Sequence, residues 1–258
     1  MNSMKKLDGN YVKSYYDGFL SGYDKEYSYY RWQAGPVEKI HYSQTKRALV
    51  PFLKTLKGNV LEIGGGDAIW TMEYISGIQN LTFLDISQEM ISRAQKRLEK
   101  FSQKISYVND DFLINDLSNK KFDHVVSIRN LEYFVDKESV ISKIYNQLNG
   151  NGTFVLVTKS PKYHLRDSAK QKTLHTSQIQ ISDLLQLMRS KGFTIKSVRP
   201  AIIGKLFRFF PMRLLSHLLH FVTLIIPWKI LPIKLLGYIS ESFVIYAKKS
   251  HSIFWPSW

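Results

Sequence analysis

The sequence predicts an α/β fold in which helices cover both faces of a mostly parallel, doubly wound sheet. Two observations support this prediction. From Ala48 onward, short apolar runs alternate with stretches whose apolar residues recur at three- or four-residue spacing, which is the rhythm of strand, helix and strand. Glycines and acidic residues follow the apolar runs, where parallel strands release the chain. At 258 residues, the chain can bury the core of one such domain and still carry an insertion.

Residues 1–47 are expected to form short helices and loops that cover the sheet. Aromatic side chains lie among acidic ones here, at Tyr15, Tyr16, Tyr23, Tyr27, Tyr29, Tyr30 and Trp32. The segment lacks the charged start and long apolar stretch of a signal peptide. Two interpretations stay open. The segment either packs on the sheet for stability alone or closes over a ligand, for which the candidates are Tyr16, Tyr23, Tyr30 and Arg31.

The most informative motif is the run Glu-Ile-Gly-Gly-Gly-Asp at 62–67, directly after the apolar Val60 and Leu61. Glycine lets a strand end in a tight turn whose backbone N–H groups approach a ligand closely. The motif is not a dinucleotide fingerprint, because the third glycine would fall at Ile69, and it has no phosphate-loop lysine. We therefore expect a ligand with a cationic amino-acid tail rather than a pyrophosphate.

The next apolar run ends at Asp85, at the tip of the neighbouring strand. A carboxylate there can accept hydrogen bonds from both ribose hydroxyls of an adenosine. Alternatively, Asp85 caps a helix that begins near Ser87. That helix is expected because apolar residues recur at helical spacing, at Ile91, Ala94, Leu98 and Phe101. A further amphipathic helix is expected from Ser182 to a stop at Gly192.

Five motifs, in this order, resemble those of class I S-adenosylmethionine-dependent methyltransferases. They are the glycine loop at 60–68, the strand and acid at 81–87, the acidic pair with phenylalanine at 110–112, the strand and exit loop at 122–133, and the turn and strand at 150–157. The resemblance covers roughly residues 48–200 and a last strand near 242–248. It implies a seven-stranded sheet, a core formed by 48–200 plus 241–250, and S-adenosyl-L-methionine as cofactor. Ala68 departs from the pattern, because a third glycine often stands there.

The resemblance also implies a cofactor site. The residues it assigns to that site are Glu62, Gly64, Gly65, Gly66, Asp67, Asp85, Ile86, Asp111, Phe112, Arg129 and Asn130. Glu62 would orient the glycine loop or the methionine amino group, and the glycines would admit the methionyl portion. Asp85 would hold the ribose, and Asp111 with Phe112 the adenine. Backbone groups of Arg129 or Asn130 would face the sulfonium, and Asp110 stays an alternative to Asp111.

No catalytic residue is assigned, because direct displacement of a methyl group mainly needs alignment and the exclusion of water. Candidates for a general base are His41, Tyr133, His164 and His175, each of which could equally be structural. No metal site is expected. The chain has no cysteine, which excludes thiolate zinc sites, disulfides and methyltransferases that attack through a cysteine. The loop at 129–133 lacks the Asn/Asp-Pro-Pro-aromatic pattern that holds a base amine, so no DNA partner is expected.

The segment 201–240 is interpreted as a basic, amphipathic insertion before the last strand. Within it, residues 205–236 carry five Lys and Arg and no Asp or Glu, around an uncharged run at 214–228. As one helix that run would span about 22 Å, which is shorter than the roughly 30 Å of a bilayer core. Lying in the interface of an anionic membrane fits it better. A lid, a homodimer contact or a docking site for a partner subunit are the alternatives.

The sequence thus predicts a cytoplasmic, peripherally membrane-associated methyltransferase. Residues 159–258 carry 16 Lys and Arg against 3 Asp and Glu, so the positive charge is concentrated where the insertion lies. The expected acceptor is hydrophobic: a quinone, a prenylated intermediate or a lipid headgroup, as in the quinone-biosynthesis, small-molecule and lipid branch of the family. The alternatives are an RNA or protein methyltransferase that docks through its basic surface, a non-catalytic cofactor-binding subunit, and, least favoured, a nicotinamide oxidoreductase.

Overall fold

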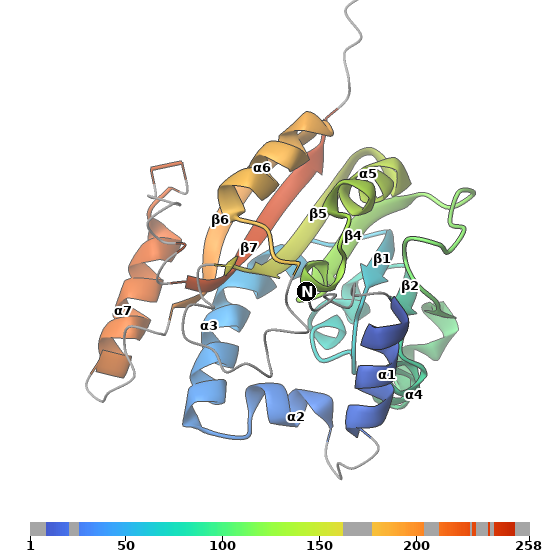
Figure 1. The fold of residues 1–258 in the computed structure, drawn as a ribbon, viewed down its shortest axis with the longest axis horizontal. Helices are drawn as coiled ribbons and strands as arrows, with labels where there is room; N and C mark the ends of the chain where they lie inside the picture. The colour runs from blue at the N-terminus through green and yellow to red at the C-terminus, as the bar shows by residue number, and fades with distance from the viewer. Residues whose placement is uncertain are drawn as a thin grey trace, which may run out of the picture.

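A seven-stranded sheet organises the protein (Figure 1). The computed structural model describes residues 9–20, 26–161, 177–203, 212–227, 229–230, 237 and 240–250. The strands are β1 (Asn59–Ile63), β2 (Asn80–Asp85), β3 (Ile105–Asn109), β4 (Phe122–Ile128), β5 (Leu148–Lys159), β6 (Phe193–Ile203) and β7 (Ser240–Lys249). Their order is β3-β2-β1-β4-β5-β7-β6. The first five are parallel, and β7 runs antiparallel to both β5 and β6. The predicted fold class is confirmed.

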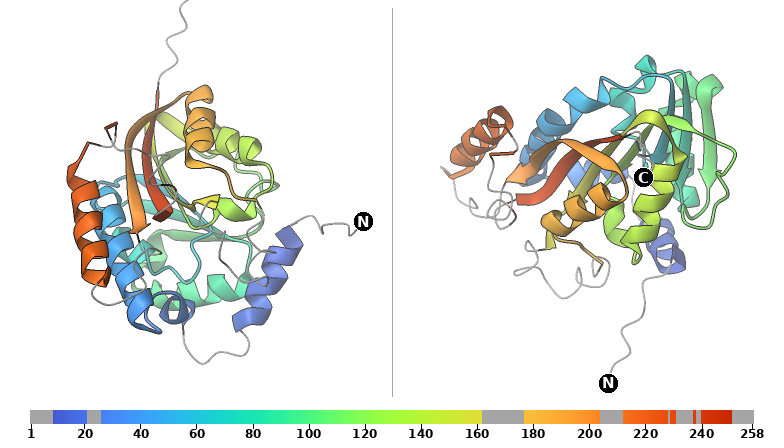
Figure 2. Two further views of the ribbon diagram at one scale, coloured as in Figure 1. Left: turned by 60° about the vertical axis from the view of Figure 1, so that its left-hand side comes forward. Right: turned by 90° about the horizontal axis from the view of Figure 1, so that it is seen from above.

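Helices cover both faces of this sheet (Figure 2). They are α1 (Gly9–Leu20), α2 (Tyr27–Trp32), α3 (Pro36–Leu53), α4 (Gln88–Arg97), α5 (Lys137–Gln147), α6 (Ile181–Ser190) and α7 (Met212–Ile225). One core cluster joins α5 and α6 to the sheet, and includes Ile141, Leu184 and Phe154. The second joins α3 and α4 to the opposite face, and includes Leu49, Ala94 and Val155. Apolar side chains of β5 thus contribute to both layers, as expected for a strand covered on both sides.

The predicted helix after Asp85 forms, with Ser87 as its N-cap. The Ser87 hydroxyl accepts a hydrogen bond from Met90 N at 3.2 Å, which satisfies one of the free donors of the first turn. The helix ends at Arg97, so Phe101 lies in the following 3-10 segment η3 (Glu99–Lys104) rather than in α4. The second predicted helix also forms as α6, and it stops before Gly192, whose φ of 97° is left-handed.

Two boundaries differ from the predicted ones. The limit at residue 47 falls inside α3, because Ala48, Leu49 and Leu53 continue its buried face. The insertion begins later than residue 201, because β6 pairs with β7 as far as Ile203. Between β1 and β2 the rhythm of strand and helix also breaks. Two 3-10 turns, η1 (Thr71–Glu73) and η2 (Ile75–Gly77), connect these strands in place of a longer helix.

Candidate functional site

The predicted cofactor residues gather at the carboxyl ends of β1, β2 and β4, where ligands bind in open α/β sheets. The chain leaves β1 through Gly64, whose N–H donates to Leu84 O at 2.7 Å, so the loop stays against β2. Gly64 and Gly66 have left-handed φ values of 67° and 59°. A Cβ on Gly65 would lie 2.3 Å from the Phe83 ring. Glycine is therefore favoured at 64 and 66 by conformation, and close approach of a neighbouring side chain requires it at 64 and 65.

Asp85 lies beside this loop with its carboxylate buried. Its Oδ2 accepts from Gly66 N at 2.9 Å and its Oδ1 from Ser87 N at 3.0 Å. Burial raises its pKa to about 6, although the backbone donors act in the opposite direction. Asp85 thus connects the glycine loop with the start of α4. The two proposed roles, ribose binding and support of the helix start, share one side chain.

The two acids after β3, Asp110 and Asp111, have different hydrogen-bond partners. Asp110 is used within its own loop, where Oδ1 accepts from Asp111 N at 2.8 Å and Oδ2 from Asn115 Nδ2 at 2.7 Å. Asp111 accepts from Leu113 N through Oδ1 at 2.8 Å, and its Oδ2 lies against Gly9, the first residue of α1. Phe112 is fully buried. This arrangement favours Asp111 over Asp110 as the residue that reaches an adenine.

Glu62 and Asp67 are buried and hold the surrounding structure together. Glu62 Oε2 accepts from the Thr71 and Tyr74 hydroxyls at 2.6 and 2.7 Å, and burial raises its pKa to about 7. Asp67 Oδ2 accepts from Ser28 N at 2.7 Å, and its Oδ1 pairs with an arginine of α4 at 3.2 Å. Glu62 therefore fits the predicted role of orienting the loop, but it lines neither of the pockets described next.

Two adjoining pockets lie at this edge of the sheet. The first, here called the Phe112 pocket, has a volume of about 260 Å³. It is lined by Gly9, Val12, Ile63, Gly64, Leu84, Asp85, Ile86, Asp110, Asp111, Phe112, Leu113, Asn130, Tyr133, Phe134, Val135 and Asp136. The second, here called the Arg129 pocket, has a volume of about 90 Å³. It is lined by Val12, Tyr16, Tyr27, Arg31, Trp32, Gly64, Gly66, Asp67, Ile69, Trp70, Asp85, Ile86, Met90, Ile128, Arg129, Asn130 and Tyr133.

The pockets share Gly64, Asp85 and Asn130 among other residues, so one elongated ligand could occupy both. The acids and Phe112 suit an adenosine in the Phe112 pocket. The glycine loop leads from there into the Arg129 pocket, whose aromatic side chains suit the reacting end of a ligand. Of the predicted cofactor residues, the two pockets are lined by Gly64, Gly66, Asp67, Asp85, Ile86, Asp111, Phe112, Arg129 and Asn130. Gly65 and Glu62 lie behind them.

The N-terminal segment covers both pockets. On α1, Gly9, Val12 and Tyr16 follow one another at three- and four-residue spacing and face the site. The Tyr16 and Tyr133 hydroxyls lie 2.5 Å apart. Arg31 of α2 also lines the Arg129 pocket, whereas Tyr30 of the same helix does not, and Tyr23 lies outside the described residues. This geometry favours closure over a ligand for Tyr16 and Arg31.

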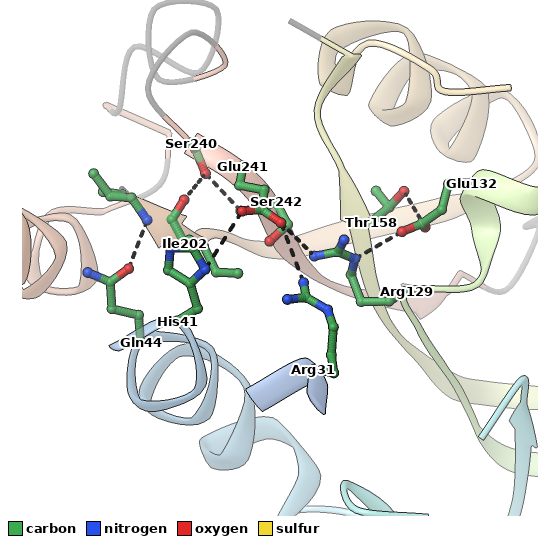
Figure 3. Close-up of polar contacts among 11 residues, drawn as sticks. Arg31, His41, Gln44, Arg129, Glu132, Thr158, Ile202, Ser240, Glu241 and Ser242 are labelled. Atoms are coloured by element: carbon green, nitrogen blue, oxygen red, sulfur yellow. Dashed lines mark hydrogen bonds and ion pairs between the residues drawn. The ribbon is translucent and has the colours of Figure 1, made fainter. Parts of the chain in front are cut away.

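A buried cluster of charged side chains borders the Arg129 pocket (Figure 3). Glu241, near the start of β7, has its Oε1 3.4 Å from Arg31 Nη2 and 3.4 Å from Arg129 Nη1. Arg129 Nε also donates to Glu132 Oε1 at 2.9 Å. Burial alone would raise the pKa of Glu241, but the positive charges of Arg129 and Arg31 hold it well below its usual range. The carboxylate therefore stays ionised and holds both guanidinium groups.

The sequence analysis did not single out Glu132 or Glu241. One signal was present, since Glu241 is one of only three acids in the last hundred residues and stands within an apolar strand. A charged side chain at such a position is normally paired. Arg129 was predicted to act through its backbone, whereas the structure brings its guanidinium to the pocket wall. Its backbone is left-handed, with a φ of 60°.

The candidate bases differ in their surroundings. His41 Nδ1 lies 3.9 Å from Glu241 Oε2, and burial lowers its pKa, so the imidazole is neutral and can accept a proton. Tyr133 is half-buried, and its removal from water together with the neighbouring Tyr27 and Glu132 raises its pKa far above the ordinary value. Tyr133 therefore keeps its proton at neutral pH and is poorly suited to act as a base. His164 and His175 lie outside the described residues.

The fold, with its strand order, is that of class I, S-adenosylmethionine-dependent methyltransferases. Residues 60–152 match the family described as a methyltransferase domain. A magnesium protoporphyrin IX methyltransferase from Synechocystis, solved with S-adenosylhomocysteine, superimposes with a TM-score of 0.63 at 16% identity over 94% of this chain and 99% of that one. The N-methyltransferase NodS from Bradyrhizobium japonicum gives 0.59 at 16% identity over 91% and 98%. The predicted enzyme class and cofactor are thereby supported.

Curated relatives match a smaller part of the chain. A carboxy-S-adenosyl-L-methionine synthase from Nautilia profundicola is 29% identical over 104 residues, which is 39% of this chain and 44% of the relative. An uncharacterized methyltransferase from Mycobacterium bovis is 29% identical over 119 residues, 46% of this chain and 58% of the relative. The chain thus spans about half the length of these relatives. The family match at 60–152 includes the glycine loop, Asp85 and Asp111 but neither α1 and α2 nor α7.

Within the described ranges, no group of three His, Asp or Glu side chains could hold a metal ion. None of the helices in those same ranges is long and apolar enough to cross a bilayer.

Proposed function

We propose that this protein transfers a methyl group from S-adenosylmethionine to a hydrophobic acceptor at an anionic membrane surface. The acceptor class is a quinone or other prenylated ring, a prenyl-linked intermediate or a lipid headgroup. The observation that carries the proposal is the apolar outer face of α7 from residue 218 onward, the part of the helix whose side chains are described.

The inner face of this part of α7 contributes two buried polar side chains as well as the partly buried Leu224. His220 and Thr223 are fully buried or nearly so, and His220 Nε2 lies 3.0 Å from Pro200 O. The outer face exposes Leu218, Phe221 and Ile225 at 59%, 52% and 67%. A water-exposed helix normally shows the reverse pattern. An outer face of this kind suits insertion among lipid acyl chains, with the exposed Lys229, shortly after the helix, at anionic headgroups.

The position of α7 connects this surface with the site. It packs on β6 and α3, beside the edge of the sheet (Figures 1 and 2). Its contact at Pro200 is close to the end of β6, and Ser242 of β7 pairs with Ile202 there. Glu241 lies next to Ser242 at the start of β7. It contacts Arg31 and Arg129, which line the Arg129 pocket. An acceptor anchored in the membrane under α7 would thus approach the pocket from the side of Arg31 and Glu241.

The chemistry asked of the protein is modest. S-adenosylmethionine, when bound, supplies a methyl group on a positively charged sulfur that an acceptor atom can displace directly. The glycine loop and Asp85 would hold the nucleoside and methionyl parts, and Asp111 and Phe112 the adenine. Tyr16 and Tyr133 close the site against water and keep their protons. His41 is neutral and lies beside Glu241 but lines neither pocket, so it would take a proton from the acceptor only through water or another group.

The membrane surface is tested with a triple variant, Leu218→Asn, Phe221→Asn and Ile225→Asn. These side chains are exposed, so the fold should tolerate the changes. The matched control is Ile114→Asn, because the Ile114 side chain is 79% exposed and lies in the connection between β3 and β4, outside α7. At about 1 kcal/mol of burial for each side chain, the triple variant should bind phosphatidylglycerol vesicles about 100-fold more weakly. Flotation with phosphatidylglycerol and with phosphatidylcholine vesicles measures this.

The acceptor class is tested by incubating the protein with radiolabelled S-adenosylmethionine and a total membrane extract. Label in the organic phase, reduced in the triple variant and unchanged in the control, would support the proposal. Equal flotation of wild type and triple variant would overturn the membrane role of α7. A change of oligomeric state without a change in flotation would assign this face to a protein contact instead. Label transferred to RNA or protein would favour the alternative acceptors.

A further inference from the structure

We infer that Arg31 and Arg129 form a subsite for a carboxylate or phosphate at the end of the Arg129 pocket. This inference rests on the proposed function and deepens it, because it specifies an acidic group on one of the two reactants. The guanidinium groups come from distant parts of the chain, α2 and the loop after β4 (Figure 3). Both arginines line the Arg129 pocket, as do Gly64 and Gly66.

The hydrogen-bonding capacity of the pair exceeds what the described protein groups use. Each guanidinium carries five N–H donors. Arg129 donates from Nε to Glu132 at 2.9 Å and from Nη1 to Glu241 at 3.4 Å, and Arg31 donates from Nη2 to the same Glu241 oxygen at 3.4 Å. The two bonds to Glu241 are long and share one acceptor atom. Several donors therefore remain for an anion that enters the pocket.

The charge balance of the cluster also favours an anion. Its cationic side chains are Arg31, Arg129 and Lys159, and its anionic side chains are Glu132 and Glu241. His41 completes the cluster and is neutral, because burial lowers its pKa. Burial, helped by the charge of Arg129, lowers the pKa of Lys159 to about 8, so it is still largely protonated at pH 7. Glu132 and Glu241 are the carboxylates that contact the arginines, and a further carboxylate, Glu38, acts on His41. An anion bound between the arginines would lower the cost of holding these positive charges together away from water.

The two arginines are held ready for such a ligand. The Arg129 N–H donates to Val157 O at 2.8 Å, which fixes the left-handed backbone, and Glu132 fixes the guanidinium. Arg31 lies over the Trp32 ring at 4.3 Å. Planar guanidinium groups fixed in this way match the geometry of carboxylates and phosphates. Aromatic walls on the same pocket, at Tyr27 and Trp70, suit an acid group carried on a flat or apolar body.

The acid group could come from either reactant, and the test separates the two sources. The variant is Arg31→Gln, because Arg31 is the more exposed of the pair and its loss leaves Glu241 with Arg129. The control is Arg189→Gln, an exposed arginine of α6 outside both pockets. Calorimetry compares S-adenosylhomocysteine with 5′-methylthioadenosine, which lacks the amino-acid carboxylate. Ligand-observed NMR compares benzoate with benzamide on protein saturated with S-adenosylhomocysteine.

If the carboxylate of the cofactor occupies the subsite, Arg31→Gln weakens S-adenosylhomocysteine at least about 10-fold and leaves 5′-methylthioadenosine unchanged. If the acceptor supplies the anion, both nucleosides bind as in wild type. The affinity of Arg31→Gln for benzoate is then lower by a similar factor, while its affinity for benzamide is unchanged. Either result supports the subsite, provided that Arg189→Gln behaves as wild type. Unchanged affinity for all four compounds would overturn it.

Failure of the proposed function gives a different pattern. Wild-type protein that binds neither nucleoside would overturn the assignment of the cofactor site. The benzoate and benzamide comparison on the ligand-free protein would then still decide the anion subsite, since Arg31-dependent binding of benzoate supports it and its absence overturns it.

Discussion

Asp85→Asn is expected to weaken binding of the cofactor and, without ligand, to raise the stability of the protein. In wild type the buried carboxylate accepts from Gly66 N and Ser87 N, and it faces both pockets. The variant keeps one acceptor oxygen and loses the negative charge. Two ribose hydroxyls would then share that single oxygen. A hydrogen bond to a charged acceptor contributes about 1.5–3 kcal/mol, so affinity for S-adenosylhomocysteine should fall about 100-fold.

Stability without ligand should change in the opposite direction. The pKa of Asp85 is raised from the ordinary 3.8 to about 6, so its ionisation opposes folding by about 3 kcal/mol. A raised pKa gives stability that is complete below pH 4 and is lost as pH rises towards 6. Asparagine avoids that loss but leaves one backbone N–H with a poorer partner, at a cost of about 1 kcal/mol. Above pH 7 the variant should therefore be more stable by about 2 kcal/mol.

Thermal unfolding without ligand, at pH 4.5 and pH 8, together with calorimetry, measures both effects. The melting temperature of Asp85→Asn should exceed that of wild type by about 4 °C or more at pH 8, and the difference should shrink at pH 4.5. Asp183→Asn, a change at an exposed carboxylate of α6, is the control and should do neither. A variant that melts lower than wild type at pH 8 would refute the reasoning about burial. One that retains wild-type affinity for S-adenosylhomocysteine would refute the cofactor assignment.

Three further substitutions test other parts of the site. Glu241→Gln leaves two guanidinium groups without their shared carboxylate, and chemical denaturation should show a loss of about 3–5 kcal/mol; a loss below 1 kcal/mol would contradict the burial of an ionised pair. Gly65→Ala places a Cβ against Phe83 and should abolish S-adenosylhomocysteine binding in calorimetry. Gly66→Ala meets only left-handed backbone strain of about 1–2 kcal/mol, so circular dichroism should show that this variant remains folded. Ser87→Ala removes the cap of α4 and should lower the free energy of unfolding by about 1 kcal/mol in urea, and no change would show that the cap is dispensable.

The sheet and the cofactor edge could be predicted from the sequence because local rules dictate them. The glycine loop can be recognised in the sequence, since the backbone conformations and close contacts at residues 64–66 favour glycine. Ser87 and Gly192 mark the ends of two helices through capping chemistry that acts within a few residues. Asp85 and Asp111 follow strand ends, so parallel topology alone brings them to one edge. In each case, neighbours in the sequence carry the information.

The remaining features depend on contacts between distant segments. The predicted boundary at residue 47 was wrong because burial of Leu49 and Leu53 on the sheet extends α3 past the end of the aromatic segment. Tyr16 and Tyr133 are separated by 117 positions, and Arg31 and Glu241 by 210. Periodicity in the sequence cannot indicate contacts between residues that are so far apart in the chain. The outward polarity of α7 likewise follows from which face meets β6, which the sequence of the helix does not specify.

The two pockets differ in charge, because the charged side chains that line the Phe112 pocket are all acidic, whereas Asp67 and Asp85 share the Arg129 pocket with Arg31 and Arg129. Acids line the Phe112 pocket, where Asp85, Asp110 and Asp111 can accept hydrogen bonds from hydroxyl and amino groups. The Arg129 pocket ends at two arginines whose partner carboxylates are already engaged in holding them. A sulfonium placed between these ends would be attracted towards the acids and repelled by the arginines. Glu241 reduces that repulsion, and an acidic group bound between the arginines and the sulfur would reduce it further. Loss of Glu241 should therefore weaken S-adenosylmethionine, which carries the positive sulfur, more than the neutral thioether S-adenosylhomocysteine, and equal weakening of both would show that the carboxylate acts on folding alone.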